Sequence, residues 1–448
     1  MRGLRSTIAL VVVLAGLGAY IYFVTWKTPA GDTGKKSEKV FAGLQADKIE
    51  ELRITSAGGD ATTLKKDNGT WQVMQPVTAK ADESEISGIT SALSTTDVVR
   101  VIDENPSSLN EYGLSNPRIE VDFKAAGDKD YRKLFIGEKS PTGADLFAKR
   151  NDEKKVFLIQ AFQESTFNKD TFALRDKVVL KFDREKVDGL EVSAGGKTLV
   201  LAKDGADWKI KKPLETRADY GSVEGLIGRV QSAQMKAIAA DQATPADLKK
   251  YGLEKPEATV NISAGSARAT LLVGGKATDT TVYARDASKP AVVTVETALM
   301  DDLKKGADDY RRKDLFEFRA YNATRVELMR GSDTVVFERV KGQGDNAQDK
   351  WRRVSPNPAD VDRDKVEAML AKIANMRASA FVEASAKTAA KPALEVHVKF
   401  EDGKKEERVS FIKADSDVFA VRPGEPGAAK ADAADLTDTL KSLDELGK

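Results

Sequence analysis

WQVMQPVTAKAD, at residues 71–82, is a pattern to which the chain returns twice. The later copies are WKIKKPLETRAD at residues 208–219 and WRRVSPNPADVD at residues 351–362. Each copy has a proline five residues after its tryptophan and an aspartate eleven residues after it. The copies begin about 140 residues apart, which is the size of a domain and not of a short solenoid repeat. The sequence therefore predicts three related domains in tandem.

Two further motifs indicate that the copies arose by duplication. Tyr112-Gly113-Leu114 returns as Tyr251-Gly252-Leu253, and the strand-like segment at 134–137 returns at 271–274, each time ending in glycine. The third copy lacks the Tyr-Gly-Leu motif and keeps only Lys391-Pro392 before its next strand. We therefore expect the third domain to be a degenerate copy.

Each unit has the pattern of a mixed fold. Alternating apolar residues predict strands, and Asn68-Gly69 and Asp204-Gly205 predict hairpin turns that lead into the tryptophan strand. An amphipathic helix is predicted after each proline, with Ile86, Ile89 and Leu93 on its apolar face in the first unit. The predicted fold class is α+β, with mostly antiparallel sheets and helices packed on them.

Aspartate and glycine are predicted to delimit the helices. Asp82, Asp219 and Asp362 precede the amphipathic helices, where a carboxylate accepts hydrogen bonds from the exposed amides of the first turn. In the first unit, Glu85 completes a capping-box pattern with Asp82. A short second helix is expected to stop at Gly113 or Gly252, because glycine readily adopts the left-handed conformation that ends a helix.

The first residues predict a membrane anchor. No charged residue occurs from Ser6 to Trp26, and a single span needs about 20 apolar residues. Arginines precede this run and aromatic residues cluster at its far end, which predicts an amino terminus in the cytoplasm and a body outside it. A cleaved signal peptide is the alternative, because small residues at positions 16–19 could form a cleavage site.

The domain borders follow from these elements. We predict a transmembrane anchor at residues 1–26, a polar tether at 27–43, and repeat domains at 44–177, 178–314 and 315–448. The junctions near Lys177–Lys181 and Lys313–Phe316 contain no linker rich in glycine, serine and proline. Adjoining domains are therefore expected to touch and to form a stiff rod.

The composition excludes several classes of function. The 71 basic and 70 acidic residues nearly cancel and are interleaved, so the electrostatic footprint of a nucleic-acid-binding protein is missing. The sequence has no cysteine and one histidine, which excludes thiolate zinc sites, disulfides and any centre with two histidines. No phosphate-binding glycine loop or calcium-binding loop is recognisable. We expect no nucleic-acid partner, no metal and no cofactor.

His397 is the first candidate for acid–base chemistry. The alternation of its strand places it on the face opposite Val396 and Val398, together with Glu395 and Lys399. No serine with a nucleophile-elbow pattern accompanies it. It is interpreted as a residue of a solvated face, and no catalytic residue is predicted, so the protein is not expected to be an enzyme.

The repeated motif residues have two interpretations. The tryptophans and prolines could form an aromatic shelf for a ligand, or they could be core and corner residues, with the aspartates as helix caps and the Tyr-Gly-Leu motifs as packed helix ends. The structural interpretation is favoured for all of them: Trp71, Pro76, Asp82, Tyr112, Gly113, Trp208, Pro213, Asp219, Tyr251, Gly252, Trp351, Pro356 and Asp362.

The Trp-x4-Pro pattern followed by Ala81-Asp82 or Ala218-Asp219, the Tyr-Gly-Leu-x2-Pro motifs and the Leu-x2-Gly strand resemble the bacterial family called domain of unknown function 4340. The resemblance covers most of residues 40–315 and the remainder more weakly. It implies a single-span membrane protein, often encoded beside ABC-type transport components similar to those associated with gliding motility. It implies no catalytic residues.

These observations together predict a non-enzymatic, membrane-anchored envelope protein. It is expected to lie in the bacterial inner membrane as a single-pass protein, with its body in the periplasm. It would act as a scaffold or accessory subunit for a protein partner, such as an ABC permease of a transport complex. The alternative is a periplasmic module that binds glycan or peptide, which would require a concave aromatic pocket around the tryptophans.

Overall fold

The computed structural model describes residues 38–342, 348–385 and 387–446. The predicted anchor at 1–26 and most of the predicted tether at 27–43 lie outside the described residues. Within the described part, no helix is long and apolar enough to cross a membrane. The chain divides into two compact units, one ending at Asp176 and one comprising Lys177–Lys448. The second unit holds the second and third repeats.

The first repeat forms a nine-stranded antiparallel sheet with the strand order β4-β3-β2-β1-β6-β7-β8-β9-β5. Its strands are β1 (Ile49–Thr55), β2 (Ala61–Asp67), β3 (Thr70–Gln75), β4 (Ala79–Lys80), β5 (Arg100–Asp103), β6 (Ile119–Ala125), β7 (Arg132–Lys139), β8 (Asp145–Arg150) and β9 (Val156–Gln160). Its helices are η2 (Ala46–Lys48), α2 (Glu83–Thr95), η3 (Asn110–Tyr112), α3 (Gln163–Phe167) and α4 (Thr171–Leu174).

The second repeat has the same strand order, β13-β12-β11-β10-β15-β16-β17-β18-β14. Its strands are β10 (Val187–Ala194), β11 (Lys197–Asp204), β12 (Asp207–Lys212), β13 (Thr216–Arg217), β14 (Ala237–Ala240), β15 (Ala258–Ala264), β16 (Ala267–Lys276), β17 (Thr281–Asp286) and β18 (Val292–Glu296). Its helices are η4 (Arg184–Lys186), α5 (Tyr220–Gln231), α6 (Pro245–Lys250), α7 (Thr297–Leu303) and α8 (Ala307–Tyr310).

The third repeat keeps this order in a sheet of β22-β21-β20-β19-β24-β25-β26-β27-β23. Its strands are β19 (Ala323–Arg330), β20 (Asp333–Val340), β21 (Lys350–Ser355), β22 (Ala359–Asp360), β23 (Ala380–Val382), β24 (Leu394–Phe400), β25 (Lys405–Ala414), β26 (Asp417–Val421) and β27 (Ala428–Ala431). Its helices are α9 (Arg363–Ala374) and α10 (Ala433–Leu446).

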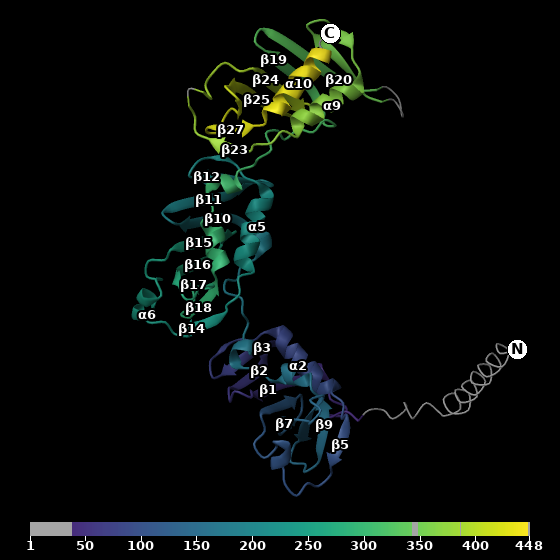
Figure 1. The fold of residues 1–448 in the computed structure, drawn as a ribbon, viewed down its shortest axis with the longest axis vertical. Coiled ribbons are helices and arrows are strands. Elements are labelled where there is room, and N and C mark those ends of the chain that lie inside the picture. The colour runs from purple at the N-terminus through teal and green to yellow at the C-terminus, as the bar shows by residue number, and fades with distance from the viewer. Residues whose placement is uncertain (1–37, 343–347, 386, 447–448) are drawn as a thin grey trace, which may run out of the picture. The chain divides into compact units, whose positions relative to one another are not determined.

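The three repeats are therefore mostly antiparallel sheet with few helices, a composition more β-rich than the predicted α+β class suggests. The amphipathic helices occur where the sequence predicts them, and α2, α5 and α9 each lie against their own sheet (Figure 1). Ile86 and Ile89 of α2 are fully buried against the alternating apolar residues of the strands. This one-sided burial is what the 3.6-residue periodicity predicts.

The predicted hairpin turns are also present. Asn68 and Gly69, between β2 and β3, both have positive φ, as the tight turns favoured between antiparallel strands require. Gly205 has positive φ in the corresponding turn between β11 and β12. Both turns lead directly into the strand that carries the tryptophan.

Each repeat begins with a short leading segment, which comprises residues 38–40, 177–179 or 313–315. This segment pairs with the residues that follow the main helix of the same repeat: Val98 N donates to Glu38 O (2.7 Å), Met235 N to Lys177 O (2.8 Å) and Ala378 N to Lys313 O (2.7 Å). Because the two partners are about 60 residues apart in each repeat, the pairing joins the start of the repeat to the segment that follows its main helix.

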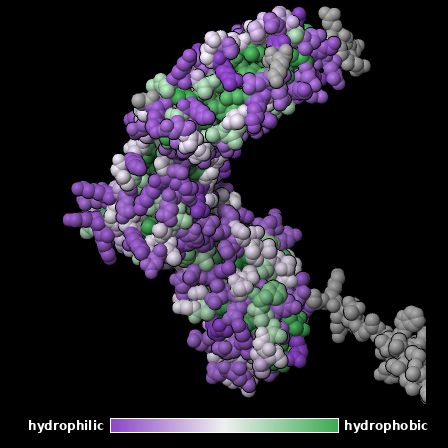
Figure 2. Space-filling model, turned by 45° about the horizontal axis from the view of Figure 1, so that its top comes forward, coloured by the Kyte–Doolittle hydropathy of each residue, from purple (hydrophilic) through white to green (hydrophobic). Residues whose placement is uncertain are grey.

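The surface of the folded repeats is mostly hydrophilic on the face that Figure 2 shows, with hydrophobic residues in small areas. The exposed large hydrophobic residues, such as Phe162 and Tyr321, are separated along the chain. Single exposed apolar residues of this kind are normal for a protein surface.

Candidate functional site

The three repeated tryptophans are core residues. Trp71, Trp208 and Trp351 are 5%, 2% and 1% exposed. The indole N–H of Trp208 donates to the Glu224 carboxylate on α5 (3.1 Å), and the backbone amide of Trp71 donates to Glu83 on α2 (2.8 Å). The tryptophan strand is thus tied to the main helix. Trp351 does line a surface pocket of about 730 Å³ together with Val340 and Arg363. A side chain that is only 1% exposed nevertheless presents to a ligand almost none of the aromatic face that the shelf interpretation requires.

The repeated prolines form the corner between the tryptophan strand and the short edge strand that follows it. The peptide bonds Gln75–Pro76, Lys212–Pro213 and Ser355–Pro356 are all cis. All three repeats therefore share one corner geometry, including the degenerate third copy. The prolines belong to the backbone framework.

The repeated aspartates are N-caps, the position that the sequence predicts for them. Asp82 accepts from the amides of Ser84 (3.0 Å) and Glu85 (3.2 Å), and Asp219 accepts from Ser222 (2.8 Å). Asp362 accepts from the amides at 364 and 365. Each carboxylate satisfies amides that the first helical turn leaves without an intrahelical partner.

The predicted capping box at Asp82 and Glu85 is wrong. The amide of Asp82 donates to the carbonyl of Leu174 (2.9 Å), while the Glu85 carboxylate pairs with Lys169 (2.8 Å). In a capping box the Glu85 side chain would accept from the amide of Asp82. That amide instead donates to a carbonyl near the end of the first repeat. The corresponding amide of Asp219 donates to Tyr310 O (2.7 Å) in the same way.

The Tyr-Gly-Leu motif and the glycine of the Leu-x2-Gly strand contact one another. Gly113 and Gly252 adopt φ values of 65° and 71°, which favour glycine. A Cβ on Gly137 would lie 2.1 Å from Tyr112 O, and a Cβ on Gly274 would lie 2.3 Å from Tyr251 O. The two sequence motifs are therefore the two halves of one close backbone contact.

The tyrosines of this motif pack on the face of the sheet away from the main helix. The Tyr112 ring lies 5.1 Å from that of Phe147, and the Tyr251 ring lies 4.4 Å from that of Tyr283. The Tyr251 hydroxyl donates to Ala239 O (3.2 Å). These contacts fasten the crossing segment before β6 or β15 to the sheet.

His397 is the fourth residue of β24, and its ring lies between the carboxylates of Glu327 (3.6 Å) and Glu406 (3.5 Å). It is half-buried on the outer face of the sheet. The fourth residues of β6 and β15 are Asp122 and Asn261, so this position is polar in all three repeats. Burial raises the pKa of Asp122, although Lys133 pairs with it at 3.2 Å.

A cation in each repeat binds the carbonyl of the leading segment. Arg150 donates to Val40 O (2.6 Å), Lys289 to Val179 O (3.5 Å) and Arg422 to Leu315 O (2.7 Å). Each of these cations forms an ion pair with an acidic residue three positions away in sequence. The sequence prediction missed this arrangement, because the order of the two charges is reversed in the second repeat.

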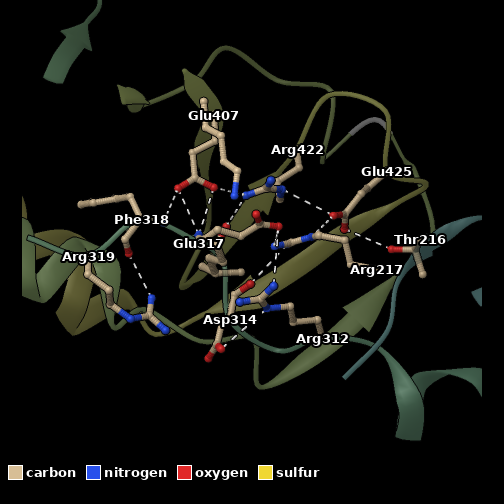
Figure 3. A network of polar contacts seen from close by, with 12 residues as sticks. Thr216, Arg217, Arg312, Asp314, Glu317, Phe318, Arg319, Glu407, Arg422 and Glu425 are labelled. Carbon is tan, nitrogen blue, oxygen red and sulfur yellow. Dashed lines mark hydrogen bonds and ion pairs between the residues drawn. The ribbon is translucent and has the colours of Figure 1, made fainter. Parts of the chain in front are cut away.

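The third repeat adds a buried carboxylate at Glu407, whose side chain is 3% exposed. It accepts from the backbone amides of Glu317 (3.0 Å) and Phe318 (2.9 Å) and from the guanidinium of Arg422 (2.8 Å) (Figure 3). The sequence does hold a signal for it, since Glu407 alternates with Val409 and Phe411 on the inward face of β25. An acidic residue in an apolar alternation indicates a buried partner.

A polar network extends from Glu407 to the second repeat. Arg217 of β13 pairs with Glu425 (2.5 Å) and Glu317 (3.3 Å) of the third repeat, and Thr216 donates to Glu425 (3.1 Å) (Figure 3). Burial alone would raise the pKa of Glu317, but the guanidinium groups around it, first that of Arg217, hold the pKa below its usual value. The predicted contact between the second and third repeats is thus present.

Arg311 is a further contact across this junction. It is 5% exposed, and its guanidinium stacks 3.8 Å from the Phe381 ring centroid and donates to Pro426 O (3.3 Å). A cavity of about 20 Å³ lies among these residues and Arg217. This volume suffices for one water molecule, so the cavity is no ligand pocket.

A surface groove of about 510 Å³ lies between α5 and α8 of the second repeat. Three of its charged residues are paired, since Asp302 contacts both Arg229 and Lys305 at 2.7 Å. Among the described residues, no group of three His, Cys, Asp or Glu side chains is arranged to hold a metal ion. The candidate functional region is therefore the charged junction, with this groove as a second surface feature.

Comparisons with solved structures carry no argument about this chain. A DNA polymerase sliding clamp from Pseudomonas aeruginosa matches with 8% identity, 88% of this chain, 93% of that chain and a TM-score of 0.14. DNA polymerase III subunit beta from Borrelia burgdorferi matches with 7% identity, 86% of this chain, 90% of that chain and a TM-score of 0.13. Such scores do not indicate a shared fold.

No curated protein matches the sequence. The sequence model of the domain of unknown function (DUF4340) does match, over residues 71–220, 208–350 and 351–448. Each match begins at one of the repeated tryptophans, so the sequence repeat starts about 30–40 residues after the leading segment that begins each folded repeat. Because the matches span most of the sequence, the chain belongs to the DUF4340 family.

Proposed function

We propose that this protein is a non-enzymatic, membrane-anchored scaffold or accessory subunit of the bacterial envelope, and that its partner is the permease of an ABC-type transport complex. The observation that carries the proposal is that the repeated residues serve the fold, as core indoles and helix caps in all three copies and as close backbone contacts in the first two. Duplicating such a domain multiplies surface without multiplying a reactive centre.

The location belongs to the same proposal. The uncharged run from Ser6 to Trp26 supports a single-pass anchor in the inner membrane, with the three repeats in the periplasm. In this arrangement the first repeat follows the membrane after a short polar tether. A partner within the membrane would then lie within reach of the repeats.

The test is affinity purification of the full-length protein, tagged at its carboxy terminus, from mild-detergent extracts of its native membranes. The control is a tagged chain of residues 1–43. Stoichiometric recovery of an ABC permease or ATPase with the full-length protein, and not with the control, is the expected result. Equal recovery with both chains, or no transport component with either, would contradict the proposal.

A second candidate is a periplasmic module that binds glycan or peptide. It is favoured by the groove between α5 and α8, whose volume of about 510 Å³ is in the range of small-ligand sites. Gly225 lines this groove, and a Cβ there would meet nothing within 4 Å. The buried tryptophans do not contribute to it.

This candidate predicts that Gly225→Trp abolishes binding of cell-wall glycan fragments or peptides to the full-length protein. The matched control is Gly88→Trp, at the same place on α2 of the first repeat, where a Cβ would also meet nothing within 4 Å. Equal binding by both variants and by the unchanged protein would exclude the groove as the binding site.

A further inference from the structure

The junction between the second and third repeats is held largely by charged side chains. The main hydrophobic core of the third repeat runs from Leu315 to Leu446 and includes no residue of the second repeat. Across the junction, Arg217 and Arg312 instead form ion pairs with Glu317 and Glu425. Arg311 donates to the carbonyl of Pro426 and stacks on the Phe381 ring. Charged contacts of this kind resemble those of separable domain interfaces more than those of a single core.

The backbone hydrogen bonds of the second and third repeats end and begin at adjacent residues of this junction. The amide of Arg312 donates to Arg217 O (3.1 Å) and ends the pairing of the second repeat. The carbonyl of the next residue, Lys313, accepts from Ala378 N (2.7 Å) and begins the pairing of the third. Any change in the angle between the two repeats must therefore occur by rotation at residues 312 and 313.

Comparison of the repeats identifies Glu425 as the residue specific to this junction. Glu153, Lys289 and Glu425 each lie five residues after the strand alanine at 148, 284 or 420. Glu153 and Lys289 each pair at 2.9 Å with the charge three residues before them. Glu425 is 3.4 Å from its own Arg422 and lies closer to Arg217 of the second repeat. Its carboxylate thus adds a shorter contact between repeats to the contact within its own repeat.

We propose that the Arg217–Glu425 pair is an electrostatic latch that fixes the angle between the second and third repeats, with residues 312 and 313 as the hinge. The pair is suited to this role because its side chains are only 17% and 20% exposed. Salt screens such a pair less than a surface pair, yet raised ionic strength still weakens it. The latch would let the local ionic environment set how the carboxy-terminal repeat is presented to a partner.

The latch can be tested in the full-length protein because the sequence contains no cysteine. Spin labels at Ala246→Cys on α6 and Lys441→Cys on α10 report the distance between the repeats by double electron–electron resonance. In about 0.1 M salt, where the Debye length is about 10 Å, we expect one narrow distance distribution. Glu425→Gln and Arg217→Gln are each expected to broaden it about twofold or to add a second distance.

The matched control is Glu153→Gln, which removes the equivalent carboxylate of the first repeat and is expected to leave the distribution unchanged. The unmodified chain provides a measurement that needs no junction variant, since raising the salt to about 1 M should also broaden its distribution. Narrow distributions in both junction variants, or no response of the unmodified chain to salt, would overturn the latch. The test does not depend on the identity of any transport partner, so its outcome is separate from that of the purification.

Discussion

The backbone of Gly274 passes so close to Tyr251 that a Cβ on residue 274 would lie 2.3 Å from the tyrosine carbonyl oxygen. The atom that this Cβ would meet belongs to the backbone, which cannot move away by a change of rotamer as a side chain can. Gly274→Ala should therefore lower the free energy of unfolding by more than about 2 kcal/mol, measured by urea denaturation. Gly225→Ala is the control, because it lies in α5 with open space around its Cβ and should raise stability by about 0.5–1 kcal/mol. Equal effects of the two substitutions would contradict the close contact.

Asp219 should contribute to stability in a pH-dependent way. Burial alone would raise its pKa, but the hydrogen bonds from Ser222 and the charges of Arg377 and Arg312 outweigh burial and lower the pKa below its usual value. A lowered pKa gives stability that is present above the unfolded-state value of about 3.9 and is lost as the pH falls through the folded-state value.

Removing the Asp219 cap with Asp219→Ala should cost about 1–2 kcal/mol at pH 7. Asp219→Asn keeps an acceptor for the Ser222 amide and should cost less at pH 7, while removing part of the loss of stability at acidic pH. Denaturation curves of the two variants from pH 3 to pH 7 test this. A steeper acid dependence in Asp219→Asn than in the unchanged protein would contradict it.

Glu407 should be among the most sensitive positions of the third repeat. Its carboxylate accepts from two backbone amides and from Arg422, so its removal leaves the two amides without their acceptor and takes an anionic partner from the half-buried Arg422. We expect Glu407→Ala to cost about 3–5 kcal/mol. The neighbouring Glu406→Ala removes a side chain that is 65% exposed and should cost less than about 0.5 kcal/mol. Similar losses from both would show that Glu407 is not an anchor.

Tyr310 should make the second repeat sensitive to alkaline pH. Burial, together with Asp302 and Asp309, raises the pKa of its phenol to about 12. The unfolded chain releases this proton near pH 10, so the stability contributed by Tyr310 is fully present below pH 10 and is lost as the pH rises toward 12. Tyr310→Phe should reduce this alkaline loss, which thermal unfolding between about pH 9 and pH 11 measures. Tyr321→Phe, at a site that is 78% exposed, should leave the alkaline loss unchanged.

The candidate residues were predictable where their role is local. An aspartate before an amphipathic run predicts an N-cap because the bond that it makes spans only two or three residues. The sequence alone could not show that Glu85 does not complete a capping box. Its intended donor, the amide of Asp82, is taken by Leu174 O, about 90 residues away, and no local pattern records such a partner.

The contacts at the charged junction were also not predictable from local sequence patterns, because their partners lie still further apart in the sequence. The alternation of Glu407 with Val409 and Phe411 in β25 is a signal of a buried carboxylate that the sequence analysis did not use. The alternation also does not tell which amides the carboxylate binds. The reversal of Asp286 and Lys289 relative to Arg422 and Glu425 is visible when the repeats are aligned on their strand alanines, but that alignment does not tell which carbonyls the cations bind. The Arg217–Glu425 contact joins residues about 200 positions apart.

The number of repeats, their family, their helix caps and their hairpin turns could be predicted from the sequence, because these depend on spacing and on interactions within a few residues. The tertiary structure alone decided the nine-strand order of each sheet, the meeting of the Tyr-Gly-Leu motif with the strand glycine, and the ion pairs between the second and third repeats. These features depend on which distant segments the folded backbone brings together. Long-range proximity of that kind depends on how the whole chain packs and produces no periodic pattern in the sequence.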